Sequence, residues 1–325
     1  MKVLLTGANG FVGSHILDLL CARGIAAAVL LRPTADPRFI AAHRAAIDLR
    51  TGSINDAGSV AAALPDITHV IHCAGCTKAL RLSDFDRVNR AGTRNVVEAV
   101  SRPGSGVQRL VHVSSLAAAG PAGPGAPARE DDPPHPVSAY GRSKLAGEEE
   151  VRTACRAEHV ILRPSAVYGP RDAEFLRMFR AIARHLRPRP TRQPLSFAFV
   201  KDIAEVAVAA LTHPAAAGRT YHVAASEVRT AREFADEVAA QLRTWTLPLP
   251  LPTAALAPFC WLQDGLSWIT RRPSVLSRQK IAELRAPGWV CDASRLRQEL
   301  GLVCGTALQP GIAQTLAWYR QEGWL

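Results

Sequence analysis

Short apolar runs alternate with longer amphipathic stretches through the first half of the chain. Val12, Ile16, Leu19 and Leu20 recur at the spacing of one helix face, and Gly24 follows where such a helix would stop. The apolar runs are bounded by turn residues, so we expect strands at Val3–Leu5, Ala26–Leu31, Val70–His72, Leu110–Ser114 and Val160–Leu162. Strands that alternate with helices predict an α/β fold with a doubly wound parallel sheet, which we expect over residues 1–170.

The pattern is looser in the second half of the chain. It predicts helices at Phe175–His185 and Ile203–Leu211, with a strand at Phe197–Val200 between them. We therefore expect residues 171–325 to form mainly a smaller substrate-binding lobe, with some segments returning to the first sheet.

The stretch Thr246–Arg272 is apolar and rich in tryptophan and proline. Its four prolines and the charged Asp264 argue against a membrane-spanning helix. We expect an amphipathic helix that covers the substrate, and peripheral membrane contact is the alternative interpretation.

Composition and charge narrow the class of protein. The 325 residues are 48% hydrophobic and 21% charged, as in ordinary globular proteins. The net charge of +11 comes from scattered arginines without interleaved aromatics, so we expect no nucleic-acid partner but a field that favours a phosphorylated cofactor.

The cysteines and the first residues bear on the compartment. The opening strand breaks at glycine too early for a signal peptide, and seven irregularly spaced cysteines indicate reduced thiols, so a cytoplasmic protein is expected. Cys73 and Cys76 have no second pair or histidine cluster at metal spacing, and no metal site is predicted.

A glycine-rich turn lies between the first strand and the first helix. Gly7 allows the tight turn, Gly10 lets the backbone approach a pyrophosphate, and Gly13 lets the helix pack against the strand. The helix N-terminus then offers free N–H groups to the anion. The turn predicts a Rossmann-type dinucleotide site, to which we assign Gly7, Asn9, Gly10, Phe11, Val12 and Gly13.

The end of the second strand bears on the choice of cofactor. An acidic residue there commonly binds the ribose 2′-hydroxyl of NAD, whereas a cation suits the 2′-phosphate of NADP. Arg32 occupies this position and favours NADP, while Asp36 a few residues later leaves NAD open.

Tyr140 and Lys144 lie four residues apart, on one face of a predicted helix. A free phenol ionises near pH 10, and a nearby cation favours the phenolate that can exchange a proton with a substrate hydroxyl or carbonyl. Ser115 ends a strand 25 residues before Tyr140 and can hydrogen-bond the developing alkoxide; Ser114 is the weaker candidate.

Several further motifs occur in a fixed order: HCAG at His72–Gly75, VNRAGTRNVVEA at Val88–Ala99, RPSAVYGPRD at Arg163–Asp172 and FAFVKDIA at Phe197–Ala204. With the glycine turn and the Tyr/Lys helix, the chain resembles the extended short-chain dehydrogenase/reductase superfamily nearly end to end. That superfamily contains sugar-nucleotide epimerases and dehydratases, dihydroflavonol reductases and 3β-hydroxysteroid dehydrogenases.

The resemblance assigns roles to particular residues. It implies that Ser115, Tyr140 and Lys144 are the catalytic triad and that Asn89 supports the lysine through water. It further implies a homodimer built from Ala91–Val100 and Ser143–Arg152, and a cofactor site that also includes Ala74, Gly75, Pro164 and Val167.

Two departures from the superfamily pattern affect binding. Gly52 is followed by Ser53 and Ile54 instead of the aspartate that holds the adenine amino group, so any bond to adenine from Ser53 is weaker. Leu195 stands where sugar-nucleotide enzymes have a phosphate-binding arginine. A leucine cannot pair with a diphosphate, and a contact from the nearby Arg192 or Arg189 is the alternative that stays open.

Together with the tryptophan-rich stretch, Leu195 favours an apolar substrate. The leading hypothesis is an NAD(P)-dependent dehydrogenase or reductase that interconverts a secondary alcohol and a ketone of steroid or dihydroflavonol type. The alternative is a nucleotide-sugar epimerase or dehydratase with tightly bound NAD. A cofactor-binding regulator without chemistry is a third hypothesis, which the presence of both Tyr140 and Lys144 disfavours.

Overall fold

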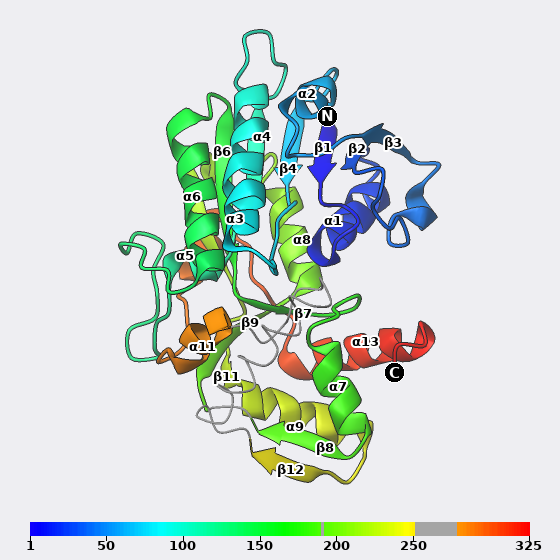
Figure 1. The fold of residues 1–325 in the computed structure, drawn as a ribbon, viewed down its shortest axis with the longest axis vertical. Coiled ribbons are helices and arrows are strands. Elements are labelled where there is room, and N and C mark those ends of the chain that lie inside the picture. The colour runs from blue at the N-terminus through cyan, green and yellow to red at the C-terminus, as the bar shows by residue number, and fades with distance from the viewer. Residues whose placement is uncertain (190–191, 251–277) are drawn as a thin grey trace.

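A parallel seven-stranded sheet forms the centre of the protein (Figure 1). The structure is a computed structural model that describes residues 1–189, 192–250 and 278–325. The strand order is β10-β6-β5-β4-β1-β2-β3, and every pairing in this sheet is parallel. The strands are β1 (Lys2–Thr6), β2 (Ala26–Leu31), β3 (Ile47–Thr51), β4 (His69–His72), β5 (Arg109–Val113), β6 (Glu158–Pro164) and β10 (Arg219–Val223).

Helices cover both faces of this sheet, and each face has its own apolar core. On β1, Val3 and Leu5 point into one core while Leu4 points into the other, because side chains alternate along a strand. The first core packs against α1 (Phe11–Ala22), α8 (Val200–Ala209) and α12 (Ser294–Leu300). The second core packs against α2 (Ala57–Ala62), α4 (Gly92–Val100) and α6 (Ala139–Ala154). The doubly wound Rossmann-type α/β fold expected from the sequence is confirmed.

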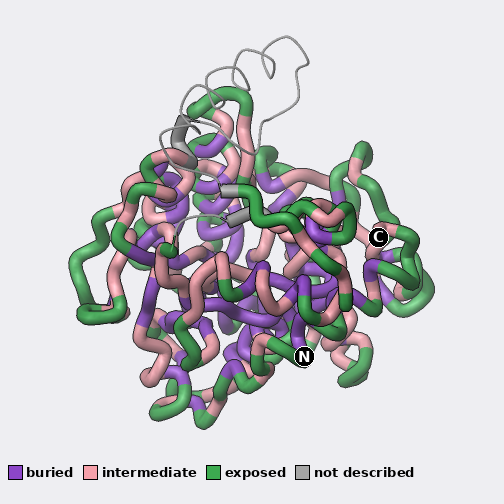
Figure 2. Tube along the Cα trace, turned by 90° about the horizontal axis from the view of Figure 1, so that it is seen from below, coloured by how far each residue is buried: buried purple, intermediate pink, exposed green. Residues whose placement is uncertain are grey.

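Shorter elements connect these layers. They are η1 (Ala41–His43), α3 (Leu82–Phe85), the π-helix η2 (Asp86–Ala91), α5 (Leu116–Ala119) and η3 (Pro214–Ala216). Buried residues concentrate in the sheet and in the inner faces of its helices, while the connecting loops are exposed (Figure 2).

A second group of elements lies beyond the carboxyl ends of the strands (Figure 1). It contains a three-stranded sheet of β7 (Ala166–Tyr168), β9 (Pro194–Phe199) and β11 (Val228–Thr230), and a two-stranded sheet of β8 (Leu186–Arg189) and β12 (Leu247–Pro250). Its helices are α7 (Leu176–Ala183), α9 (Ala231–Leu242), α11 (Arg278–Arg285) and α13 (Leu308–Gln321). The core here is aromatic and includes Tyr168, Phe179, Phe197, Phe199, Phe234 and Tyr319.

All five strands expected in the first half are present, and α1 ends just before Gly24, whose φ is +64°. Strands β3 and β10 were not anticipated. The expected helix over Thr246–Arg272 is wrong for its first residues, because Leu247–Pro250 form strand β12. Prolines at 248 and 250 lack the N–H that a helix interior needs. The rest of that expected helix, residues 251–272, lies outside the described residues.

None of the helices in the described ranges is both long enough and apolar enough to cross a membrane.

Candidate active site

The glycine-rich turn joins β1 to α1 without room for side chains. Gly7 has a φ of +77°, and a Cβ there would lie 2.7 Å from the backbone nitrogen of Ala74. A Cβ on Gly13 would lie 2.1 Å from the carbonyl oxygen of Gly7, so α1 packs directly on the turn. The Gly10 N–H donates to the Gly7 carbonyl at 2.9 Å, and no side chain caps the helix. This backbone cradle fits the pyrophosphate of a dinucleotide.

The other predicted residues of the turn surround this cradle. Asn9, Phe11 and Val12 are half-buried, and the Phe11 ring lies edge-on to His15 with 6.1 Å between centroids. They therefore form the wall of the turn, where the predicted contact with cofactor can occur.

Arg32 is exposed immediately after β2. Its guanidinium group forms no hydrogen bond or ion pair with any residue that the structure describes. Burial raises the pKa of the nearby Cys76 thiol, and the charge of Arg32 is one of the influences that oppose this rise. A free guanidinium at this strand end is available to an anionic group.

The two residues assigned to adenine differ in their environment. The Ser53 hydroxyl accepts a hydrogen bond from the Asn55 N–H at 3.2 Å, within its own loop. Ile54 is buried, and its carbonyl accepts from the Asn95 side chain at 2.7 Å. These contacts hold the loop in place.

Tyr140 and Ser115 meet although they are far apart in the sequence. Ser138 begins α6 by accepting the Gly141 N–H at 3.0 Å, which places Tyr140 in the first turn of the helix. Ser115 follows β5 and caps α5 by accepting the Ala117 N–H at 3.2 Å. Burial raises the pKa of Tyr140 to about 12, and a hydrogen bond between the Tyr140 and Ser115 side chains opposes this rise.

Lys144 lies one helical turn after Tyr140 and is buried. Its Nζ donates to the Val113 carbonyl at 2.8 Å, at the carboxyl end of β5. Burial lowers the pKa of Lys144 to about 8, and no carboxylate contacts it in the described part of the chain. A Cβ on Gly75 would lie 3.8 Å from this Nζ, so Gly75 borders the ammonium group.

Asn89 lies in the π-helix η2, and a Cβ on Gly75 would lie 3.3 Å from its Oδ1, so Gly75 borders Asn89 as well as Lys144. Its Oδ1 accepts the Cys76 N–H at 2.7 Å, and its Nδ2 donates to the Cys76 carbonyl and to the Ser143 hydroxyl, both at 2.9 Å. The side chain thus fastens the loop after β4 to the helix that carries Tyr140 and Lys144.

The remaining predicted residues lie around the same edge. Pro164 is buried at the end of β6, Val167 is half-buried in β7, and Leu195 is half-buried in β9. The ring of Phe85 in α3 packs against Tyr140 with 6.1 Å between centroids.

A buried hydrogen-bond chain behind the site was not anticipated from the sequence. The Thr93 hydroxyl donates its one proton to the Asn89 carbonyl at 2.7 Å, so it accepts from His72 Nε2 at 3.0 Å. The opposite nitrogen of His72 accepts from Thr6 Oγ1 at 2.7 Å, and this oxygen accepts the Ala74 N–H at 3.2 Å. Burial lowers the pKa of His72 to about 3, so the ring is neutral. The chain links β1 beside the glycine turn to the segment of Asn89.

A second unanticipated feature is the buried carboxylate of Glu148, one turn after Lys144. It accepts from Arg163 at 2.7 and 2.9 Å, from Arg152 at 2.7 Å and from the Ser114 hydroxyl at 2.5 Å. Burial alone would raise the pKa of Glu148, but these partners hold it below its usual range. Glu148 thereby joins α6 to the ends of β5 and β6.

The fold and the glycine turn define a dinucleotide-binding enzyme of the Rossmann type. The chain belongs to the NAD dependent epimerase/dehydratase family, whose model matches residues 3–224. This confirms the resemblance to the extended short-chain dehydrogenase/reductase superfamily.

Individual relatives span nearly the whole chain. A ceramide reductase of Caulobacter vibrioides is 32% identical over 99% of this chain and 96% of its own length. A UDP-glucose 4-epimerase of Vibrio cholerae is 26% identical over 97% of this chain and 94% of its own length. The solved structure of the Bordetella bronchiseptica enzyme WbmG in complex with NAD is 24% identical, with a TM-score of 0.80 over 100% of this chain and 95% of that chain.

Proposed function

We propose that this protein is an NADP-preferring reductase or dehydrogenase that interconverts a ketone and a secondary alcohol on an apolar molecule. The observation that carries the chemistry is the Tyr140 phenol, hydrogen-bonded to Ser115 and one turn from the buried ammonium of Lys144. The apolar substrate is supported by Leu195, which has no charge to offer a nucleotide diphosphate, and by the likeness to a ceramide reductase.

The residues divide the work as follows. The backbone around Gly7, Gly10 and Gly13 binds the dinucleotide, and the bound nicotinamide supplies or accepts the hydride. In reduction, Ser115 orients the carbonyl oxygen and Tyr140 donates the phenolic proton as the oxygen gains charge. Lys144 then stabilises the phenolate that Tyr140 becomes, and the burial that raises the pKa of Tyr140 makes this cation necessary.

The test is a direct assay of cofactor consumption. Purified protein is mixed with NADPH and a panel of apolar ketones of ceramide, steroid and dihydroflavonol type. We expect one NADPH to be oxidised for each alcohol formed, and we expect Tyr140→Phe to reduce kcat by about 10²–10⁴-fold. Turnover that Tyr140→Phe leaves unchanged would refute the proposed mechanism.

A substitution at Arg32 tests the proposed preference for NADP separately. Arg32→Ser should raise the KM for NADPH by about tenfold and leave the KM for NADH within about twofold, because only NADP carries the 2′-phosphate. Arg44→Ser is the matched control, since Arg44 is also exposed and forms no side-chain ion pair in the described residues. Equal increases in the KM values for NADPH and NADH would show that Arg32 does not bind the 2′-phosphate.

Epimerisation of a nucleotide sugar is the second candidate, supported by the UDP-glucose 4-epimerase among the relatives. Such an enzyme would convert UDP-glucose with no net change in the absorbance of the reduced cofactor. This outcome, with no oxidation of added NADPH by any ketone, would replace the reductase proposal.

A further inference from the structure

Large apolar side chains are exposed together on the two-stranded sheet of β8 and β12. Trp245, Leu247, Leu249 and Leu186 are 71%, 60%, 44% and 43% exposed. Leu247 pairs with Leu186 in the sheet, and Leu249 is two residues further along, so the three leucines share one face. The Trp245 ring stacks on His185, with 4.1 Å between centroids, beside that face. We call these four residues the apolar tip.

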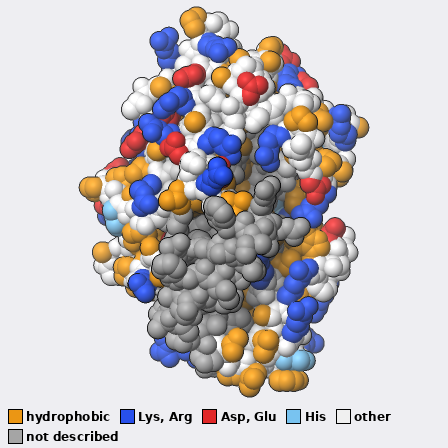
Figure 3. All heavy atoms as spheres, viewed as in Figure 1, with side chains coloured by type: hydrophobic (Ala, Val, Ile, Leu, Met, Phe, Trp, Pro, Cys, Tyr) orange, Lys and Arg blue, Asp and Glu red, His pale blue; other side chains and the backbone are white. Residues whose placement is uncertain are grey.

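The tip projects at one end of the molecule. The sheet of β8 and β12 lies at the extremity of the ribbon, and the space-filling view shows hydrophobic side chains gathered at this end beside Lys and Arg side chains (Figures 1 and 3). The contacts that hold it are local: the Leu247 N–H donates to the His185 carbonyl at 2.7 Å.

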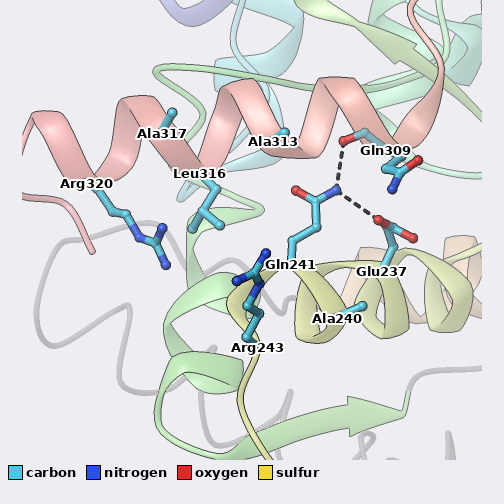
Figure 4. A pocket seen from close by; sticks show the side chains of 9 residues that line it. All are labelled: Glu237, Ala240, Gln241, Arg243, Gln309, Ala313, Leu316, Ala317 and Arg320. Atoms are coloured by element: carbon cyan, nitrogen blue, oxygen red, sulfur yellow. Dashed lines mark hydrogen bonds between the residues drawn. The ribbon is translucent and has the colours of Figure 1, made fainter.

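Two arginines without partners lie at the base of the tip. Arg243 ends α9 immediately before the tip, and Arg320 lies on α13; both side chains extend into one groove of about 480 Å³ (Figure 4). Neither guanidinium group forms a hydrogen bond or an ion pair with any residue that the structure describes. At the other end of the groove the Gln241 amide bridges the Glu237 carboxylate and the Gln309 carbonyl, and the two arginines outnumber this carboxylate in the lining of the groove. The groove therefore offers two free cations to an anion.

A lipid surface suits this combination better than a protein partner does. A stable protein interface buries roughly 800 Å² on each side, which needs far more than four side chains. A bilayer instead accepts a few inserted Trp and Leu side chains, while adjacent arginines bind its phosphates. Arg184, at the end of α7, is also exposed without an ion pair among the described residues and adds to the positive field.

We infer that the apolar tip and the Arg243–Arg320 groove form a docking surface for an anionic lipid bilayer. The tip inserts below the headgroups, and the two guanidinium groups bind lipid phosphates at the membrane surface. This inference goes beyond the proposed function and does not depend on it, because it involves no residue of the catalytic edge.

Sedimentation with vesicles tests the inference without any substrate. The full chain is mixed with vesicles of phosphatidylcholine alone or of phosphatidylcholine with an equal amount of phosphatidylglycerol. We expect sedimentation with the anionic vesicles and much less with the neutral ones. Arg243→Glu/Arg320→Glu should weaken the binding by about thirtyfold or more, and Trp245→Ser/Leu247→Ser by about tenfold or more.

Matched controls separate the surface from general charge and hydrophobicity. Arg102→Glu/Arg156→Glu makes the same change of net charge on exposed arginines elsewhere and should retain most of the binding. Val303→Ser removes an apolar side chain that is 62% exposed and should have no effect. All substituted positions are exposed, and thermal melting checks that each variant is folded.

Three results would overturn the inference. The first is no sedimentation with either vesicle, and the second is an equal loss in the tip or groove variants and in the controls. The third is a change from dimer to monomer in Trp245→Ser/Leu247→Ser without vesicle binding by the unsubstituted protein, which would assign the tip to a second copy of the chain.

Discussion

Two buried charges lie one turn apart on α6, and their surroundings are opposite. Glu148 is compensated by Arg163 and Arg152 and by the Ser114 hydroxyl, and its pKa stays below the usual range despite burial. The Nζ of Lys144 donates to the Val113 carbonyl and contacts no carboxylate in the described part of the chain, and burial lowers its pKa to about 8. A compensated buried charge fixes the positions of the elements it joins, whereas an uncompensated one has a pKa close to the working pH and can respond to a substrate.

The largest expected effect is on activity at Lys144. Lys144→Met should reduce kcat for ketone reduction by about 10²–10⁴-fold, because the phenolate of Tyr140 loses its cation. The free energy of unfolding should change by no more than about 1 kcal/mol, since an uncompensated buried charge contributes little to stability. Single-turnover kinetics and urea unfolding measure the two quantities. A severe loss of stability would mean that Lys144 is an anchor like Glu148.

At Glu148 we expect a large effect on stability, in contrast to Lys144. Glu148→Ala should lower the free energy of unfolding by about 3–5 kcal/mol, because Arg163 is left buried without its partner. Glu149→Ala, at the exposed neighbouring position, should stay within about 0.5 kcal/mol of the unsubstituted protein. Urea unfolding compares the two variants.

A double variant sharpens the result at Glu148. Glu148→Met/Arg163→Met removes both charges and should be more stable than Glu148→Ala, because no buried ion remains unpaired between these two positions. If the double variant is less stable than Glu148→Ala, the ion pair between Glu148 and Arg163 stabilises the folded protein beyond preventing an unpaired buried charge.

The adjacent Ser115 and Ser114 should differ in the same way, one affecting activity and the other stability. Ser115→Ala should reduce kcat by about 10²-fold, because the substrate oxygen loses a donor. Ser114→Ala should leave kcat within about threefold and lower the free energy of unfolding by about 1–2 kcal/mol, because it removes a hydrogen bond to the Glu148 carboxylate. Initial rates and urea unfolding of both variants check the pair, and the reverse pattern would make Ser114 the catalytic serine.

The smallest expected effect concerns pH. The pKa of Lys144 is depressed to about 8, so the ammonium is charged below pH 8 and kcat/KM for reduction should fall about tenfold per pH unit above it. The Glu148 carboxylate raises the pKa of Lys144, so Glu148→Gln should move this decline to lower pH. Lys144→Arg keeps its charge at all these pH values. If Lys144→Arg is active and declines at the same pH as the unsubstituted protein, another group is responsible.

The sequence was sufficient for the architecture because the main signals are local. Alternating apolar runs located five strands, and the glycine spacing located the turn between β1 and α1. Strand β3 was missed because Asp48 and Arg50 interrupt its apolar pattern at the edge of the sheet. The edge strand β10 joins the sheet beside β6, from which it is separated by a long stretch of chain, so no local pattern could place it.

The site was only partly accessible from the sequence. The spacing of Tyr140 and Lys144 on a helix and the strand end at Ser115 come together as expected, and their catalytic roles stay predictions. Glu148 lies in a run of three glutamates that reads as a solvated helix face. Its burial depends on Arg163, which arrives from a different element, and such pairings appear only once the sheet is assembled.

The π-helix that holds Asn89 has a consequence for how the chain can change length. Its extra residue sets the rotation of α3 about the helix axis relative to α4. Deleting a single residue from Asp86–Ala91 would restore the ordinary helical repeat and rotate the preceding turn by about 100°. The ring of Phe85 would then leave Tyr140. Substitutions at the exposed positions Asp86, Arg87 and Arg90 should therefore be tolerated more readily than a one-residue deletion or insertion in this segment.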